Sequence, residues 1–131
     1  YAIQQDLQVM MQGLVGIVRQ DTEIQKALDG LVQLNDRTNQ VSVVGHREYN
    51  TGWHTALDLR NLLTVSEAVA RAAIMRQESR GAHFRTDITG RDDKNWLKHT
   101  LVFKDVNSEN GVRVETAPVT ITKWKPIERR Y

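Results

Sequence analysis

Cysteine is absent from this 131-residue sequence, and only two prolines and eight glycines are present. The chain therefore has no disulfide bond, no thiolate metal ligand and no cysteine nucleophile, and an intracellular location is compatible with that lack. No apolar run approaches the ~18 residues that span a bilayer, and no signal-peptide pattern opens the chain. Repeats and low-complexity segments are also missing. The remaining composition is that of an ordinary globular domain that enters no membrane unaided.

Charges of both signs are mixed along the chain. Lys and Arg total 18 and Asp and Glu total 16, for a formal net charge of +2 at pH 7. A nucleic-acid-binding domain concentrates uncompensated basic residues on one face, so we expect no nucleic-acid partner. The length is enough to bury one modest core, which predicts a single domain over residues 1–131. Because the chain opens on Tyr1 with an amphipathic pattern, we expect it to be a fragment of a longer protein.

Apolar residues of the first segment recur at spacings of four and three residues, which predicts a helix that ends near Arg19. The apolar face of this helix would comprise Ile3, Leu7, Met10, Leu14 and Ile17. Gly13 and Gly16 each cost about 1 kcal/mol relative to Ala inside a helix. We therefore expect these two glycines to permit close approach of a neighbouring element.

A second helix is predicted to run to about Thr38. Thr22 and Gln25 have the spacing of a capping box, and Asp21 adds negative charge at the start of the same helix. The apolar stripe of this helix comprises Ile24, Ala27, Leu28, Leu31 and Leu34. A connector over residues 40–51 follows the helix.

A third helix is predicted over residues 52–79, with Asn50 or Thr51 as its N-cap. No proline or glycine interrupts it after Gly52, and four alanines between residues 68 and 73 would let another helix pack closely. Three amphipathic helices with short connectors most economically form an antiparallel bundle, which resembles a spectrin repeat. We assign this bundle to residues 1–79.

The hydrophobic period changes to two residues from residue 97 onward. An alternating run at residues 97–104, a turn cluster at 107–111 and a second run beginning at Val112 together predict a β-hairpin. Pro118 introduces a third extended piece over residues 119–124. The predicted fold is therefore mainly α: a three-helix bundle, a charged loop at 80–96, and a C-terminal β-hairpin and extended tail at 97–131.

The residues give little sign of catalysis or of metal and cofactor binding. No two of the four histidines have HxxxH spacing, so we expect no metal site. Ser79, His83 and Asp87 could form a hydrolase triad only if they converged, and no nucleophile-elbow sequence surrounds the serine. G-x-G-x-x-G and the Walker phosphate loop are both absent. We therefore assign no catalytic, cofactor-binding or metal-binding residue in this chain.

Residues 76–100 are dense in charges that alternate in sign. One interpretation is a solvated loop whose surface ion pairs are each worth roughly 0–1 kcal/mol. The other is an interface between domains or subunits, in which arginines make bidentate contacts and Trp96 is an anchor. The residue chemistry alone leaves both open and slightly favours the solvated loop.

Several motifs of the chain resemble the C-terminal part of the flavoprotein subunit of fumarate reductases and succinate dehydrogenases. The resemblance is strongest in "ESRGAHFRTD" and "RDDKNWLKHTL" at residues 78–87 and 91–101. It extends to "VGIVR" at 15–19, "LDLRNLLTVSEAVARAAIMRQESRG" at 57–81 and "PVTITKWKPIERRY" at 118–131. It therefore covers essentially the whole chain. The stretch "TDITG" before Arg91 lacks the proline or acidic residue often found there, which leaves the shape of that loop open.

The resemblance implies a three-helix bundle with a C-terminal β extension and, for the full subunit, FAD-dependent interconversion of succinate and fumarate by hydride transfer. The family's flavin-attaching histidine, glycines and dicarboxylate-binding residues lie upstream, so none is transferred to this chain. FAD is expected in the full subunit and not on this fragment. Expected partners are the FAD-binding domain of the same chain and the iron–sulfur subunit. The expected location is peripheral to the cell membrane on its cytoplasmic face, or on the matrix face of the mitochondrial inner membrane.

On this resemblance, the charged run becomes a candidate interface, and the domain itself is structural. The residues expected at the interface are Arg80, His83, Arg85, Arg91, Asp92, Asp93, Trp96 and His99. Truncation of Arg80 or Asp92 is then expected to weaken assembly and to leave the stability of the isolated chain almost unchanged. The alternatives are the helical tail of a related flavoprotein, such as L-aspartate oxidase or the α subunit of adenylylsulfate reductase, and a freestanding helical adaptor without enzyme activity.

Overall fold

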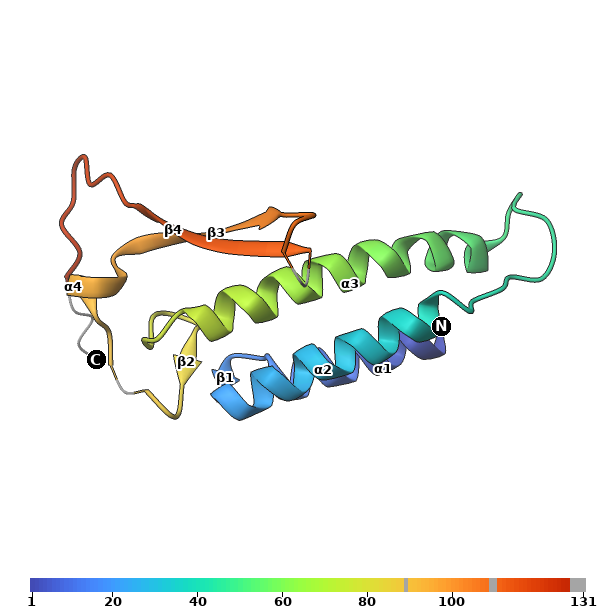
Figure 1. The fold of residues 1–131 in the computed structure, drawn as a ribbon, viewed down its shortest axis with the longest axis horizontal. Coiled ribbons are helices and arrows are strands. Elements are labelled where there is room, and N and C mark those ends of the chain that lie inside the picture. Colours follow the sequence, from blue (N-terminus) through green and yellow to red (C-terminus); the bar gives the residue numbers. More distant parts are fainter. Residues whose placement is uncertain (89, 109–110, 128–131) are drawn as a thin grey trace.

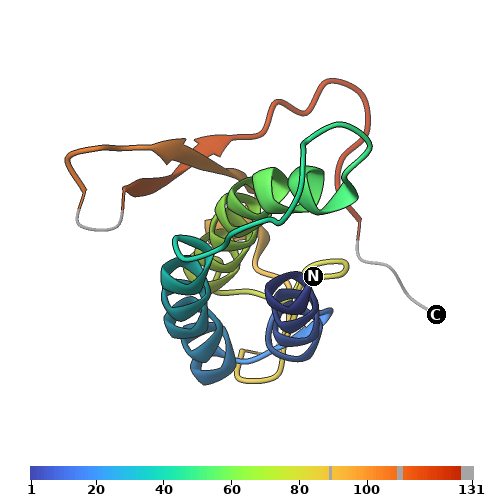
Figure 2. The same cartoon turned by 90° about the vertical axis from the view of Figure 1, so that its right-hand side faces the viewer.

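The computed structural model describes residues 1–88, 90–108 and 111–127, and its main body is a bundle of three helices (Figure 1). Helices α1 (Ala2–Leu14), α2 (Asp21–Thr38) and α3 (Thr51–Met75) alternate in direction, with α2 antiparallel to the other two. Viewed from the end, α3 lies above α1 and α2, so the three helices form a triangle (Figure 2). The predicted fold class, a mainly α three-helix bundle followed by a β-hairpin, is confirmed.

The core is built mainly from the apolar stripe of α2. Every member of the predicted stripe is buried, and Ile24 and Ala27 are completely inaccessible to solvent. Leu7 of α1, Val15 just after that helix, and Leu63, Ala70 and Ala73 of α3 complete the cluster. The stripe is correct because α2 packs along both neighbouring helices, so the whole width of its apolar face is covered. No helix in the three described stretches is both long and apolar enough to cross a membrane.

The first helix is shorter than its periodicity predicts. α1 ends at Leu14, and Val18–Arg19 forms strand β1, which pairs in parallel with β2 (Phe84–Arg85). The amide of Phe84 donates to the carbonyl of Ile17, and that of Thr86 donates to the carbonyl of Arg19, at 3.1 and 2.9 Å. Ile17, expected on the apolar face, is 66% exposed. A strand partner more than 60 residues away therefore overrides the local helical pattern.

The expectation for the glycines is wrong as well. Nothing lies within 4 Å of a side chain added at Gly13, and one added at Gly16 would meet the Gln12 carbonyl of the preceding helical turn at 2.7 Å. The close approach of two helices occurs at Gly30 of α2 instead, where an added Cβ would collide with the side chain of Met10.

The two long helices begin in different ways. Asn50 caps α3 as expected, because its Oδ1 accepts a hydrogen bond from the amide of Gly52 at 3.0 Å. The capping box at Thr22 and Gln25 is wrong, since the N-cap of α2 is Gln20 and its side chain makes no capping bond. The free amide of Asp21 donates instead to Oδ2 of Asp87 at 3.2 Å. A carboxylate from a distant loop thus replaces the local cap.

The C-terminal segment contains a short helix, α4 (Asp93–Trp96), and a hairpin of strands β3 (Lys98–Lys104) and β4 (Val112–Pro118). The hairpin is antiparallel with Val102 opposite Val114, and it lies on the side of α3 that faces away from α1 and α2 (Figure 2). Residues 119–127, which include the extended piece predicted after Pro118, have no strand assignment. α3 also ends at Met75, four residues earlier than expected, where the backbone becomes extended at Arg76.

Candidate functional site

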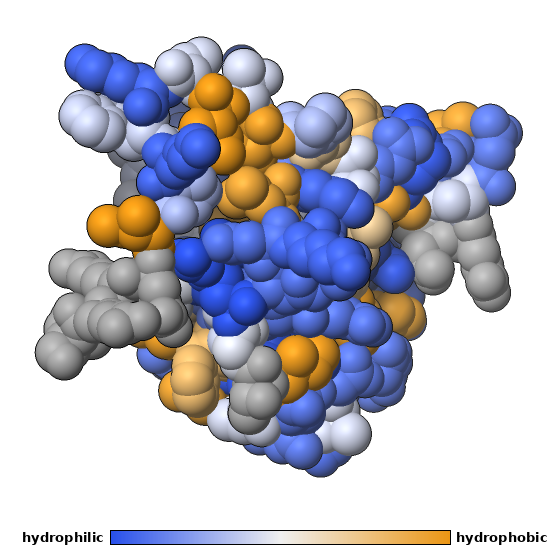
Figure 3. All heavy atoms as spheres, turned by 90° about the vertical axis from the view of Figure 1, so that its left-hand side faces the viewer, coloured by the Kyte–Doolittle hydropathy of each residue, from blue (hydrophilic) through white to orange (hydrophobic). Residues whose placement is uncertain are grey.

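The charged run folds into a compact network at the end of α3, which we call the charged junction and define as Arg76, Glu78, Arg80, Arg85, Asp87, Arg91 and Asp93. It lies where α3, β2, α4 and the start of the hairpin meet, at the end of the molecule drawn on the left of Figure 1. Its surface is mainly hydrophilic in Figure 3, with hydrophobic residues on either side.

Glu78 is at the centre of the junction, and its side chain is completely buried. Arg80 donates to both carboxylate oxygens at 2.7 and 3.0 Å, the amide of Asp92 donates at 2.9 Å, and Arg76 forms a further ion pair. Burial by itself would raise the pKa of Glu78, but the hydrogen bonds from Arg80, Asp92 and Arg76 outweigh it and lower the pKa. The ionised carboxylate therefore stabilises the fold above about pH 4.5, and this contribution is lost as the pH falls through the lowered pKa.

The network continues outward from Glu78 through alternating charges. The same Arg80 guanidinium donates to Asp93 at 2.6 Å, and Arg91 donates to the other oxygen of Asp93 at 2.8 Å. Arg91 also donates to the carbonyl of Ile127 at 2.9 Å, which ties the C-terminal segment to the junction. Hydrogen bonds of this kind to charged groups contribute about 1.5–3 kcal/mol each where they are shielded from water.

Arg76 connects the end of α3 to the hairpin. Its guanidinium donates to the carbonyl of Trp96 at 3.0 Å and to the hydroxyl of Thr100 at 3.2 Å. The same group lies 5.5 Å from the centre of the Trp96 ring, within the range of a cation–π interaction. One side chain thereby fixes α4 and β3 relative to the helix bundle.

Arg85 is a buried arginine that forms ion pairs with two more accessible carboxylates. This residue is 2% exposed and donates to both oxygens of Asp87, at 2.7 and 2.6 Å, and to Asp21 of α2 at 3.3 Å. The hydrogen bond from Arg85 is the main cause that lowers the pKa of Asp87. Because Asp87 also caps α2, the pair links the charged run to the start of that helix.

His83 is held as a neutral imidazole between two arginines. Its Nδ1 lies 2.7 Å from Nη1 of Arg19, which is a donor, and its Nε2 lies 3.1 Å from the carbonyl of Arg76. These partners place the ring proton on Nε2. Burial lowers the pKa of His83, and the charges of Arg19, Arg85 and Arg76 lower it further against an opposing contribution from the Arg76 carbonyl.

The hydrolase triad is not assembled. The hydroxyl of Ser79 donates toward the carbonyls of Arg85 and Ile88, at 3.2 and 2.9 Å, and accepts from the amide of Arg85. His83 is engaged with Arg19 and Arg76, and Asp87 is engaged with Arg85. The three groups therefore stabilise one loop and do not form a chain of proton transfer.

The junction also does not fit a phosphate-bearing cofactor such as FAD. Its arginines already bind Glu78, Asp87 and Asp93, and the buried carboxylate at the centre would repel a pyrophosphate. In the part of the chain that the structure describes, no three His, Asp or Glu side chains gather closely enough to hold a metal ion.

The predicted interface residues divide into two groups. All except His99 take part in the internal network: Arg80, Arg85, Arg91 and Asp93 in the junction, and His83, Asp92 and Trp96 beside it. His99 is exposed on β3 and lies outside the junction. The solvated-loop interpretation is wrong for Arg85, which is almost fully buried. An interface role for the set stays a prediction.

Sequence reasoning missed the residues that organise the junction. Arg76 and Glu78 stood at the end of a predicted helix, and Arg19 stood at the end of another, so none was considered as a partner. One signal was available: Arg76, Glu78 and Arg80 are spaced by two residues, and side chains at that spacing lie on the same side of an extended backbone. The alternating signs then favour ion pairs within the segment.

Fold and site together define a helical-bundle domain whose charged residues bind one another and join the bundle to a hairpin. A model of the family "Fumarate reductase flavoprotein C-term" matches residues 4–131. The fumarate reductase flavoprotein subunit of Haemophilus influenzae is 40% identical over 131 residues, which is 98% of this chain and 21% of that protein. The corresponding subunit of Mycobacterium tuberculosis is 38% identical over 130 residues, with 98% and 22% covered.

Solved structures agree with these matches. A chain of the Mycobacterium smegmatis Sdh1 complex in the apo form superposes with a TM-score of 0.80 at 41% identity, over 95% of this chain and 21% of that one. A chain of a quinol–fumarate reductase with menaquinol superposes with a TM-score of 0.85 at 36% identity, over 96% of this chain and 22% of that one. This chain belongs to the family of fumarate reductase flavoprotein C-terminal domains. It spans about a fifth of the length of the relatives it matches. The matches do not favour the alternatives, another flavoprotein's tail or a freestanding adaptor.

The junction leads to a stability prediction that reverses the expectation for this region. Glu78→Gln removes the charge that compensates Arg76 and Arg80, and we expect it to lower the free energy of unfolding by about 3–5 kcal/mol. The control is Glu67→Gln, whose i,i+4 pair with Arg71 is partly exposed and should be worth about 0.3–0.5 kcal/mol. Urea unfolding followed by circular dichroism measures both. Equal losses in the two variants would contradict a structural role for the junction. Arg80→Ala is likewise expected to destabilise the isolated chain.

The buried imidazole leads to a pH prediction. Because the folded pKa of His83 lies below the unfolded value of 6.5, its contribution is complete above that pH and declines as the pH falls below it. We expect His83→Gln to flatten the fall in unfolding free energy between about pH 6.5 and 5. His99→Gln, at an exposed position, is the control and should follow the wild-type profile. An unchanged slope in His83→Gln would rule out this assignment.

Proposed function

We propose that this chain is the C-terminal domain of the flavoprotein subunit of a succinate dehydrogenase or fumarate reductase, and that the rest of the subunit precedes residue 1. The match of the family model to residues 4–131 is the observation that carries this proposal. The full subunit would be an FAD-dependent oxidoreductase that interconverts succinate and fumarate. Relatives with the subunit names of both enzymes are similar to this chain, so either direction of the reaction fits.

The domain itself has a structural role in this proposal. FAD and the dicarboxylate are bound by the preceding part of the subunit, because the charged junction offers no free cationic site for phosphates. The internal ion pairs hold the bundle and hairpin as one rigid unit, and this unit braces the flavin-binding domain. Residues 1–131 thus act as a single domain with three parts: the bundle at 1–79, the charged segment at 80–96, and the hairpin and tail at 97–131.

The outer rim of the junction is proposed to contact the iron–sulfur subunit. Arg91 of the junction and His99 near the start of β3 are both exposed, and Trp96, which lies between them in the sequence, is half-buried. These residues would offer a partner both charge and an aromatic anchor. Location follows from the assembly: partner subunits would hold the protein at the cytoplasmic face of a cell membrane, or at the matrix face in a mitochondrion. Structures similar to this chain include an Sdh1 complex and a quinol–fumarate reductase, which supports an assembly of several subunits.

The assignment of chemistry is tested by comparing the isolated chain with the full-length subunit. We expect the isolated chain to bind no FAD, seen as no flavin absorbance after dialysis against the cofactor, and to reduce no fumarate with a chemical electron donor. The full-length subunit should contain stoichiometric flavin and should be active. Flavin bound to the isolated chain, or a full-length protein without flavin, would refute the proposed function.

The proposed subunit contact is tested with two exposed residues. Arg91→Ala together with His99→Ala, in the full-length flavoprotein subunit, should weaken binding of the iron–sulfur subunit by roughly 5–10-fold in a titration. The matched control replaces Arg47 and His46, which are also exposed but lie on the connector at the opposite end of the molecule (Figure 1). Equal affinities of the two double variants for the iron–sulfur subunit would contradict the proposal that Arg91 and His99 contact it.

A further inference from the structure

We propose that the seam between α1 and α3 is the face on which the bundle docks against the preceding part of its own flavoprotein polypeptide. This inference rests on the proposed function, since it takes the remainder of the subunit as the occupant. It places the main internal interface on an apolar helix face and not on the charged junction.

The three helices are packed unequally. α2 packs along both α1 and α3, whereas α1 and α3 touch each other only sparsely. The end view shows α1, α2 and α3 at the corners of a triangle, with α1 and α2 below α3 (Figure 2). In a closed three-helix bundle each pair of helices buries a seam, so one seam here is left incomplete.

Two adjoining hollows mark this incomplete seam, and Thr55 lines both of them. One hollow lies between the start of α1, the connector and the start of α3, and its lining includes Ile3, Val41, Val43, Ala56 and Leu59. The other is lined by Gln4 of α1 and, from α3, by Asp58, Asn61, Leu62 and Val65. The first hollow has mainly apolar walls, and the second combines two apolar side chains with four polar ones. An apolar centre with a polar rim is typical of a protein interface.

An apolar stripe on α3 extends the seam. Leu62, Val65 and Val69 are spaced by three and four residues, so they lie on one face of the helix. Their exposed fractions are 37%, 62% and 42%. Isolated exposed apolar residues are common, but a row of three that continues from the apolar first hollow through Leu62 and Val65 of the second is a patch, and such patches mark binding surfaces.

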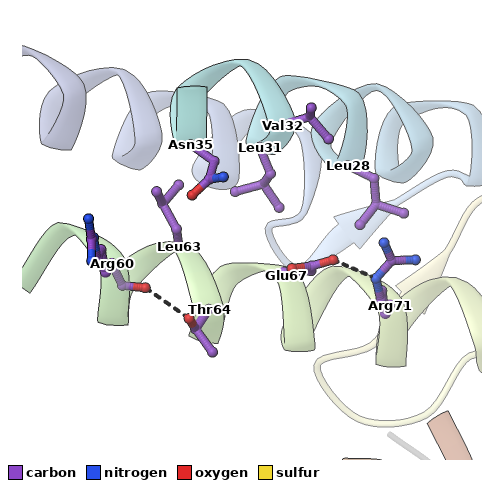
Figure 4. A pocket seen from close by; sticks show the side chains of 9 residues that line it. All are labelled: Leu28, Leu31, Val32, Asn35, Arg60, Leu63, Thr64, Glu67 and Arg71. Atoms are coloured by element: carbon purple, nitrogen blue, oxygen red, sulfur yellow. Dashed lines mark hydrogen bonds and ion pairs between the residues drawn. The ribbon is translucent and has the colours of Figure 1, made fainter. Parts of the chain in front are cut away.

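A further hollow, between α2 and α3, has a different chemistry. The groove between α2 and α3 is lined by Asn35, Arg60, Glu67 and Arg71 among its apolar residues (Figure 4). Glu67 and Arg71 bind each other at 2.8 Å across one turn of α3, and Thr64 donates to the carbonyl of Arg60. Charged groups that are already paired and partly exposed suit contact with water, so this groove is the natural comparison for the α1–α3 seam.

The occupant follows from the size and position of the missing polypeptide. Relatives of this chain are about five times its length, and the proposed function puts that remainder before residue 1. Tyr1 lines the first hollow together with Ala2, so the preceding polypeptide would enter the domain at the seam itself. A covalently attached neighbour at this position requires no separate association step, which suits an apolar surface that must remain covered.

The test uses the absence of cysteine from this chain, in the full-length flavoprotein subunit purified without other subunits. Val65→Cys places a thiol on the seam, and Val32→Cys places one at the edge of the α2–α3 groove. The two valines are 62% and 63% exposed in this domain, so they form a matched pair. Alkylation of each thiol by iodoacetamide is followed by peptide mass spectrometry, and each rate is divided by the rate in denaturing urea.

We expect the normalised rate for Val65→Cys to be at least about tenfold lower than that for Val32→Cys, because docking must open before the seam reacts. Similar rates, or slower reaction at Val32→Cys, would overturn the proposal. Protection of Val65→Cys that disappears on dilution would also overturn it, since a second copy would then be the cover. If the parent subunit contains flavin and reduces fumarate while the thiols react alike, only this inference fails. A parent protein without flavin refutes the proposed function instead.

Discussion

The buried carboxylate of Glu78 is the constraint on which the arrangement of the C-terminal half depends. Removing an ionised carboxylate from water costs several kcal/mol, and only close donors offset that cost. Arg76 and Arg80, which flank Glu78 in the sequence, and the more distant amide of Asp92 supply them. α3 must therefore end at Met75, because the following residues have to turn back and surround Glu78. The positions of α4 and of the hairpin follow from the same requirement.

A second set of long-range contacts joins the charged segment to the N-terminal half. The β1–β2 pairing, the bond between Asp87 and the start of α2, and the contact of Arg19 with His83 all lie at one end of the bundle. These contacts connect residues more than 60 positions apart in sequence. The loop after α3 therefore acts as a brace across α1 and α2, and it does so with groups that might otherwise suggest an active site.

The internal pairing of charges is consistent with the roles proposed for the two parts of the subunit: this domain is structural, and the preceding part binds the cofactor and substrate. Charged groups that satisfy one another inside a domain are not free to bind a cofactor phosphate or a dicarboxylate. In the proposed subunit, contacts with the rest of the protein would use surfaces that the domain leaves exposed: the surface near His99 and the apolar row that contains Val65. In the proposed subunit, the domain would contribute rigidity and docking surface, and the chemistry would belong to the remainder of the polypeptide.

Local patterns in the sequence determined the three helices, the buried stripe of α2, the Asn50 cap and the hairpin. Each depends on residues within one or two turns, or on a short alternating run, so the chain itself specifies it. The motif resemblance also identified the family without coordinates. Only the tertiary structure decided where α1 ends, what caps α2, and that Glu78 is buried. Those outcomes depend on contacts with distant residues such as Phe84 and Asp87. A local hydrophobic period does not show which distant residue will contact a given segment.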